Sequence, residues 1–191
     1  MPSPELSPRF DAAQRERLLA LAWQAIRLGR EAPWLGVDLE GLPAALSAPG
    51  ASFVSLHRRG ALRGCMGSLE ARRPLAEDVA GNARAAAFLD PRFPPVAPEE
   101  IAELELEISV LGPARPLPAA SEAELVAALR PGVDGLVLRE GGRRATYLPS
   151  VWTQLPDPAE FVRQLKRKAG LPPDHWSPTL GFDRYEVESI S

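Results

Sequence analysis

The residues of this sequence best able to do chemistry lie in one short stretch. The stretch reads Leu62-Arg63-Gly64-Cys65-Met66-Gly67 and contains the only cysteine of the chain. In a β-strand Arg63 and Cys65 lie on one face, where the guanidinium favours the thiolate form of the cysteine. One interpretation is a nucleophilic or substrate-contacting Cys65 in a cleft. The other is a small buried hydrophobic residue, because free cysteine is among the most buried residue types.

The glycines that flank the cysteine, Gly64 and Gly67, predict a constraint on the backbone. Glycine inside a strand marks a bulge or the close approach of another backbone or of a ligand. We therefore expect both positions to need glycine for backbone shape.

A second candidate is the stiff loop Asp90-Pro91-Arg92-Phe93-Pro94-Pro95, which carries one charge of each sign. Asp90 is either a cap for Arg92 and the following backbone, as aspartate is in turns, or part of a site. Arg92 at the rim of a cleft would suit a carboxylate or a phosphate. Both interpretations stay open from the sequence.

Three further features have a structural and a functional interpretation. Glu107 ends an acidic run that begins at Glu99, and it lies either on a solvated face or in a polar site. The basic cluster in residues 163–168 either complements a helix dipole or contacts nucleic acid. Trp152 is a core or hinge aromatic residue, or a part of the cleft.

Composition excludes several classes of function. One cysteine permits no internal disulfide and no zinc ribbon, and the chain has two histidines, so we expect neither a metal site nor a cofactor. A net charge of −3 argues against tight binding of nucleic acid. The sequence contains no signal peptide and no apolar stretch long enough to span a membrane, so we expect a cytoplasmic protein without membrane contact.

Apolar spacing predicts the elements that must position these residues. The predicted helices and strands are helices over 11–29, 74–89, 121–130 and 157–169, hairpins over 51–69 and 135–148, a strand over 104–111 and a closing strand over 182–190. Regular βαβ alternation is absent. We therefore predict an α+β fold with a mainly antiparallel sheet and flanking helices.

The first hairpin decides where Cys65 lies. A three-residue loop, Arg58-Arg59-Gly60, pairs Ser55 with Arg63 and Phe53 with Cys65. This register places Val54, Leu56, Leu62, Gly64 and Met66 on one apolar face. It also separates His57 from the level of Cys65 by about 13 Å, at about 3.3 Å per residue, which makes a Cys/His dyad a poor prediction.

Taken in order, these motifs resemble the AMMECR domain family, whose hallmark is Leu-Arg-Gly-Cys-Ile-Gly. Residues 51–56, 62–67, 90–95, 107–111, 132–136, 145–152 and 168–171 carry the resemblance, which covers about residues 11–190. Met66 replaces the usual isoleucine, and Ser150 stands where glutamine is common. Bacterial members carry the name AmmeMemoRadiSam system protein A, which records genomic company with a Memo-like and a radical-SAM protein.

The resemblance implies a single domain over residues 11–190, built of two intertwined subdomains around a cleft, after a flexible segment 1–10. The residues expected to line the cleft are Arg63, Gly64, Cys65, Gly67, Asp90, Arg92, Glu107 and Trp152. We expect the cleft to bind or process a small or peptidyl substrate in a pathway with Memo-like and radical-SAM proteins. The alternative is a non-catalytic protein- or RNA-binding module, so the sequence leaves open whether the protein is an enzyme.

Overall fold

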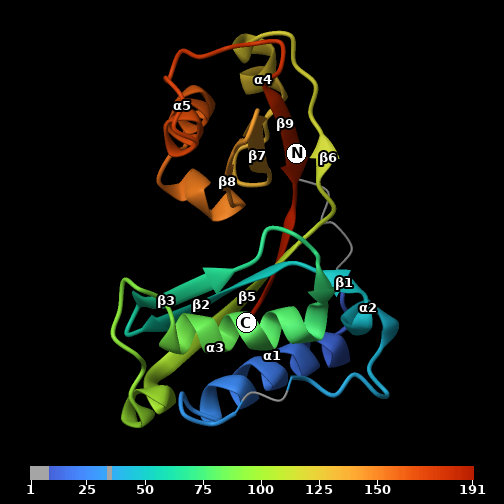
Figure 1. The fold of residues 1–191 in the computed structure, drawn as a ribbon, viewed down its shortest axis with the longest axis vertical. Helices are drawn as coiled ribbons and strands as arrows, with labels where there is room; N and C mark the ends of the chain where they lie inside the picture. The colour runs from blue at the N-terminus through green and yellow to red at the C-terminus, as the bar shows by residue number, and fades with distance from the viewer. Residues whose placement is uncertain (1–8, 34–35) are drawn as a thin grey trace. The chain divides into compact units, whose positions relative to one another are not determined.

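The fold is described from a computed structural model, over residues 9–33 and 36–191. The chain forms two compact units (Figure 1): unit 1 comprises residues 1–111 and 188–191, and unit 2 comprises residues 112–187. Residues 1–8 of the segment that was expected to be flexible lie outside the described residues. The last residue of that segment, Phe10, is buried in the core of unit 1.

Unit 1 contains a four-stranded sheet with the strand order β10-β5-β2-β3, together with a two-stranded sheet of β1 and β4. Its elements are α1 (Ala12–Arg27), α2 (Ala44–Ser47), β1 (Pro49–Gly50), β2 (Ser52–Arg58), β3 (Ala61–Gly67), β4 (Arg73–Pro74), α3 (Leu75–Phe88), the 3₁₀ helix η1 (Pro98–Glu103), β5 (Leu104–Leu111) and β10 (Val187–Ile190). Strand β2 pairs antiparallel with both β3 and β5.

Helices α1 and α3 lie on one side of this sheet (Figure 1). Helix α1 begins at a capping box, because the Asp11 carboxylate accepts from the Gln14 N–H and the Gln14 side chain accepts from the Asp11 N–H. Its apolar stripe packs with α3, and both helices share one core with Val54 and Leu56 of β2. The core of unit 1 therefore lies between the helices and one face of the sheet.

The β2–β3 hairpin differs from the predicted one in its loop and its register. The loop has two residues, Arg59 and Gly60, whose φ angles of 51° and 77° are those of a type I′ turn. A bulge then follows, because Leu56 pairs with Gly64 while the next residue of β2 pairs with Leu62.

This bulge decides which pairs form farther along the hairpin. Arg63 is the extra residue, so Ser55 pairs with Cys65 and not with Arg63, and Phe53 pairs with Gly67. The prediction that Gly64 shares the face of Val54 and Leu56 is confirmed, whereas the predicted pairing is wrong. Leu62 was predicted on the same apolar face, but it pairs with His57 and is 40% exposed.

Unit 2 contains a second four-stranded sheet, with the order β6-β9-β7-β8. Its elements are β6 (Arg115–Pro116), α4 (Glu122–Ala128), β7 (Gly135–Glu140), β8 (Arg143–Tyr147), the 3₁₀ helix η2 (Pro149–Thr153), α5 (Pro158–Lys168) and β9 (Gly181–Tyr185). Ser121 and Asp157 cap α4 and α5 as the sequence predicts. Its core includes Leu136, Leu138 and Phe161.

The predicted closing strand over 182–190 is two strands that belong to different sheets. Strand β9 pairs with β7 in unit 2, whereas β10 neighbours β5 in unit 1. The change occurs at Glu186, whose carbonyl accepts from the Gly112 N–H outside both ladders. Helices and antiparallel sheets together confirm the predicted α+β class. No helix of the described residues is long and apolar enough to cross a membrane.

Candidate functional site

The face of the unit 1 sheet that points away from α3 carries the polar candidates, and we call it the far face. The opposite face has no room for a site at Gly64, because the backbone of α3 packs on it there. A Cβ on Gly64 would stand 2.1 Å from the carbonyl oxygen of Ala86, so the backbone of α3 lies directly on the strand. The predicted close approach at Gly64 is therefore confirmed.

Gly67 has a similar role on the far face. A Cβ at this position would stand 2.3 Å from Cδ1 of Phe53 and 2.7 Å from the carbonyl oxygen of Ser52. Phe53 is the residue that pairs with Gly67, so its ring lies across the glycine. Gly64 and Gly67 shape the strand on either side of Cys65.

Three polar side chains from three adjacent strands form one row on the far face. Ser55 lies between its two pairing partners, Glu107 on β5 and Cys65 on β3. Paired residues share a face, and neighbouring strands are about 4.8 Å apart, so the row from Glu107 to Cys65 is about 10 Å long. The Ser55 hydroxyl donates a hydrogen bond to the Cys65 sulfur at 3.3 Å.

Asp90 and Arg92 extend this row beyond the edge of the sheet at β3. The Asp90 carboxylate accepts from the backbone N–H of Cys65 at 2.9 Å, and the Arg92 guanidinium donates to the Cys65 carbonyl at 3.1 Å. The two side chains thus satisfy the backbone groups that an edge strand would otherwise leave unpaired. We call Glu107, Ser55, Cys65 and Arg92 the polar row.

The charge of Arg92 is compensated by Asp90. Asp90 is 4% exposed and accepts from the Arg92 backbone N–H, from Nε at 2.9 Å and from Nη2 at 2.6 Å. These side-chain hydrogen bonds hold the pKa of Asp90 well below its usual range. The predicted cap of Arg92 is therefore confirmed. The same hydrogen bonds raise the pKa of Arg92.

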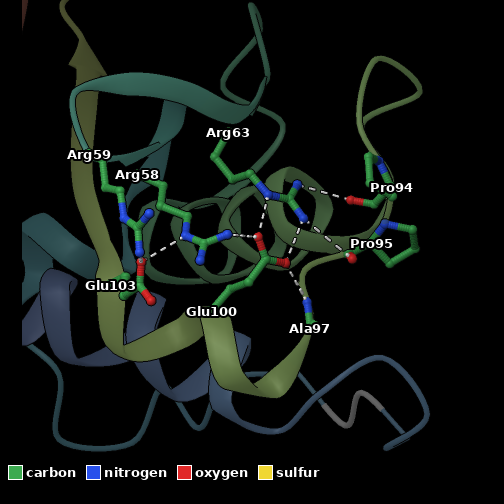
Figure 2. Close-up of polar contacts among 8 residues, drawn as sticks. All are labelled: Arg58, Arg59, Arg63, Pro94, Pro95, Ala97, Glu100 and Glu103. Atoms are coloured by element: carbon green, nitrogen blue, oxygen red, sulfur yellow. Dashed lines mark hydrogen bonds and ion pairs between the residues drawn. The ribbon is translucent and has the colours of Figure 1, made fainter.

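Arg63 has its partners inside the protein (Figure 2). It forms a two-pronged ion pair with Glu100, from Nε at 3.0 Å and from Nη2 at 2.9 Å, and Nη1 donates to the Pro94 carbonyl at 2.9 Å. The guanidinium lowers the pKa of Glu100 to about 2. As the extra residue of the bulge, Arg63 thus ties β3 to the loop that holds Asp90 and Arg92. The prediction that it lines a cleft stays a prediction.

Glu107 differs from the other acidic residues around it. Glu100 and Glu103 form ion pairs with arginines, and Glu105 is exposed. Glu107 is half-buried and forms no hydrogen bond or ion pair with any residue in the part of the chain that the structure describes.

Trp152 lies in unit 2 and does not belong to the polar row. Its ring stacks on Phe161 with 3.8 Å between the ring centroids, and its Nε1 donates to the Asp134 carbonyl at 2.7 Å. These contacts support the interpretation as a core aromatic residue. In the basic cluster of α5, Lys166 is fully buried and forms an ion pair with Glu122.

The predicted register placed Ser55 on the same face as Cys65, but opposite Arg63, and Ser55 was not singled out as a site residue. The period-2 alternation of β2 indicated the face on which Ser55 lies, whereas its pairing partner in β3 depended on the bulge. Among residues 9–33 and 36–191, no group of three or more histidine, cysteine, aspartate and glutamate side chains could hold a metal ion.

Comparison with known proteins gives the family. The AMMECR1 family model matches residues 19–190. A protein from Methanothermobacter thermautotrophicus is 43% identical over 138 residues, which are 71% of this chain and 72% of the relative. A protein from Thermococcus gammatolerans is 41% identical over 143 residues, which are 71% of this chain and 69% of the relative.

A solved structure agrees with this assignment. The crystal structure of an uncharacterized protein from Pyrococcus horikoshii matches with a TM-score of 0.83 and 32% sequence identity, over 94% of this chain and 92% of that chain. The resemblance drawn from the motifs is therefore confirmed. The chain belongs to the AMMECR1 family.

Proposed function

We propose that this protein binds a small or peptidyl ligand on the far face of unit 1, along the polar row. The observation that carries the proposal is the half-buried Glu107 carboxylate, which has no partner among the described residues and stands in line with Ser55 and Cys65. A few polar groups that converge on one surface are typical of ligand sites, where they fix the orientation of the ligand.

Binding, and not nucleophilic catalysis, is the role that the surroundings of Cys65 favour. A nucleophilic thiol needs a base within about 3 Å, yet the hydrogen-bond partner of its sulfur is the hydroxyl of Ser55. His57 lies two residues along β2 from the level of Cys65, which is about 7 Å, and Glu107 lies two strands away. Cys65 therefore contacts the ligand without attacking it.

Family membership supports a place for this binding step in a pathway with Memo-like and radical-SAM proteins. An RNA-binding module has less support, because the chain has a net charge of −3 and the polar row begins with a carboxylate. A non-catalytic module that binds a peptide segment of a protein partner is compatible with the same row.

Native mass spectrometry of the protein purified from its own host tests the proposal. We expect a co-purifying small molecule or peptide on the wild-type protein and its loss from Ser55→Val, which removes the central hydroxyl of the row. Ser109→Val is the matched control, because Ser109 lies on the same face, opposite Phe53, but outside the row. Absence of any bound species, or equal retention by both variants, would contradict the proposal.

A further inference from the structure

The charges around the polar row are unevenly compensated. Arg92 is paired with Asp90, and Arg63 is paired with Glu100. On β2 and β5, the residues of the far face next to Glu107 are Ser55 opposite it, Glu105 and Ser109 along β5, and Phe53 and His57 diagonally on β2. None of these neighbours carries a permanent positive charge.

A half-buried carboxylate without a partner costs free energy, because it has lost part of its hydration and has gained no hydrogen bond in return. The protein tolerates this cost at Glu107 although a positively charged residue at position 55 or 109 would relieve it. The arrangement fits a site in which the positive charge arrives with the ligand.

We infer that Glu107 selects ligands that present a primary ammonium group, as the amino terminus of a short peptide does. This inference rests on the proposed function, and it names the class of ligand that the same row binds. The charge-assisted hydrogen bond from an ammonium group to Glu107 is stronger than the hydrogen bond from a neutral amide to the same carboxylate.

The other end of the row sets the direction of the ligand. Arg92 is the guanidinium at that end, and its side chain is 54% exposed. A ligand with its ammonium group at Glu107 therefore places its carbonyl or carboxylate oxygens towards Ser55 and Arg92. The distance of about 10 Å from Glu107 to Cys65 corresponds to about three residues of extended peptide.

Three small probes that differ mainly in charge test this inference: glycinamide, which has the ammonium group, N-acetylglycinamide, which is neutral, and N-acetylglycine, which is anionic. Each is titrated into ¹⁵N-labelled full-length protein while backbone amide shifts are recorded. We expect glycinamide to shift the amides of Ser55, Cys65 and Glu107, and the two acetylated probes to bind at least about tenfold more weakly.

The variant Glu107→Gln should weaken glycinamide binding about tenfold or more. Glu105→Gln is the matched control, because Glu105 lies on the same face and strand but is exposed. It should leave glycinamide binding unchanged, and the spectra of both variants report whether each is folded.

Several outcomes would overturn the inference. Glycinamide shifts that survive in Glu107→Gln, or that vanish equally in Glu105→Gln, would show that Glu107 does not select the ammonium group. If N-acetylglycinamide shifts the same amides as strongly, the row binds ligands without regard to charge, so the inference fails while the proposed function stands. If no probe shifts these amides, the inference also fails, and the co-purification experiment decides the proposed function by itself.

Discussion

Asp90 accepts a hydrogen bond from the backbone N–H of Cys65 at 2.9 Å, although 25 residues separate the two along the chain. The same carboxylate holds the Arg92 guanidinium, which in turn donates to the Cys65 carbonyl. One buried aspartate thus links the edge of β3 to the loop that follows α3. The position of Cys65 relative to Arg92 depends on this link.

Replacement of Asp90 by asparagine should therefore destabilise unit 1. The variant Asp90→Asn keeps the size of the side chain but removes its charge, so Arg92 loses its ion pair. The new side-chain NH2 group is also a hydrogen-bond donor, and it faces the N–H donors that the carboxylate accepted from. We expect the free energy of unfolding to fall by about 1–3 kcal/mol. Chemical denaturation measures it, with the exposed Asp174→Asn as control, and equal midpoints for both variants would refute the role given to Asp90.

A methyl group at position 64 should also be destabilising. In Gly64→Ala the new Cβ meets the backbone oxygen of Ala86 at 2.1 Å, and neither backbone can move away without loss of packing. We expect a loss of about 1–3 kcal/mol, the usual cost of overpacking. Gly142→Ala is the matched control, because a Cβ there has no atom within 4 Å. Equal midpoints of thermal unfolding for the two variants would argue against the close approach.

Local signals were sufficient for most elements of the fold. The alternation of Leu104, Leu106 and Ile108 with acidic residues predicts β5 over its observed length, and the caps at Ser121 and Asp157 predict where α4 and α5 begin. Each of these patterns is contained in a few consecutive residues of the chain. The bulge at Arg63 has no comparable local signal, because the side chain of this extra residue is held by Glu100, 37 residues away.

Three of the four residues of the polar row were predictable from the sequence, but their arrangement was not. Residue type alone singled out Cys65, Arg92 and Glu107. The alignment of Glu107 with Cys65 follows from the strand order β5-β2-β3. Strand β5, which pairs with β2, comes from a segment about 50 residues later in the chain. The sequence gives no periodicity for such a pairing, so Ser55 was not recognised as the centre of the row.

The reactivity of Cys65 tests whether it is a nucleophile. Its side chain is half-buried, and its sulfur accepts a hydrogen bond from Ser55, so an alkylating reagent has restricted access in the native state. We expect iodoacetamide to label the native protein slowly and the protein unfolded in guanidinium chloride rapidly. Labelling of the native protein as fast as that of the unfolded chain would favour a nucleophilic role, since reactive cysteines are accessible thiolates.

The ion pair between Arg63 and Glu100 should make stability depend on acid in a defined direction. The hydrogen bonds from Arg63 are the first cause that lowers the pKa of Glu100 from 4.5 to about 2. A carboxyl group whose pKa is lower in the folded than in the unfolded state stabilises the protein above the unfolded pKa, and this contribution is lost as the pH falls towards the folded pKa. Arg63→Met should therefore be less stable than the wild type by about 1–3 kcal/mol near neutral pH. The difference should shrink as the pH falls from 4.5 to about 2. Asp90 also loses its contribution to stability in acid, but this loss occurs in both proteins and cancels in their comparison.

The control is Arg59→Met, whose arginine is 77% exposed and pairs with Glu103. The stability of this variant should differ little from that of the wild type at any pH. Denaturant unfolding at a series of pH values gives both differences, and one that stays constant for Arg63→Met would mean that Glu100 does not owe its lowered pKa to Arg63.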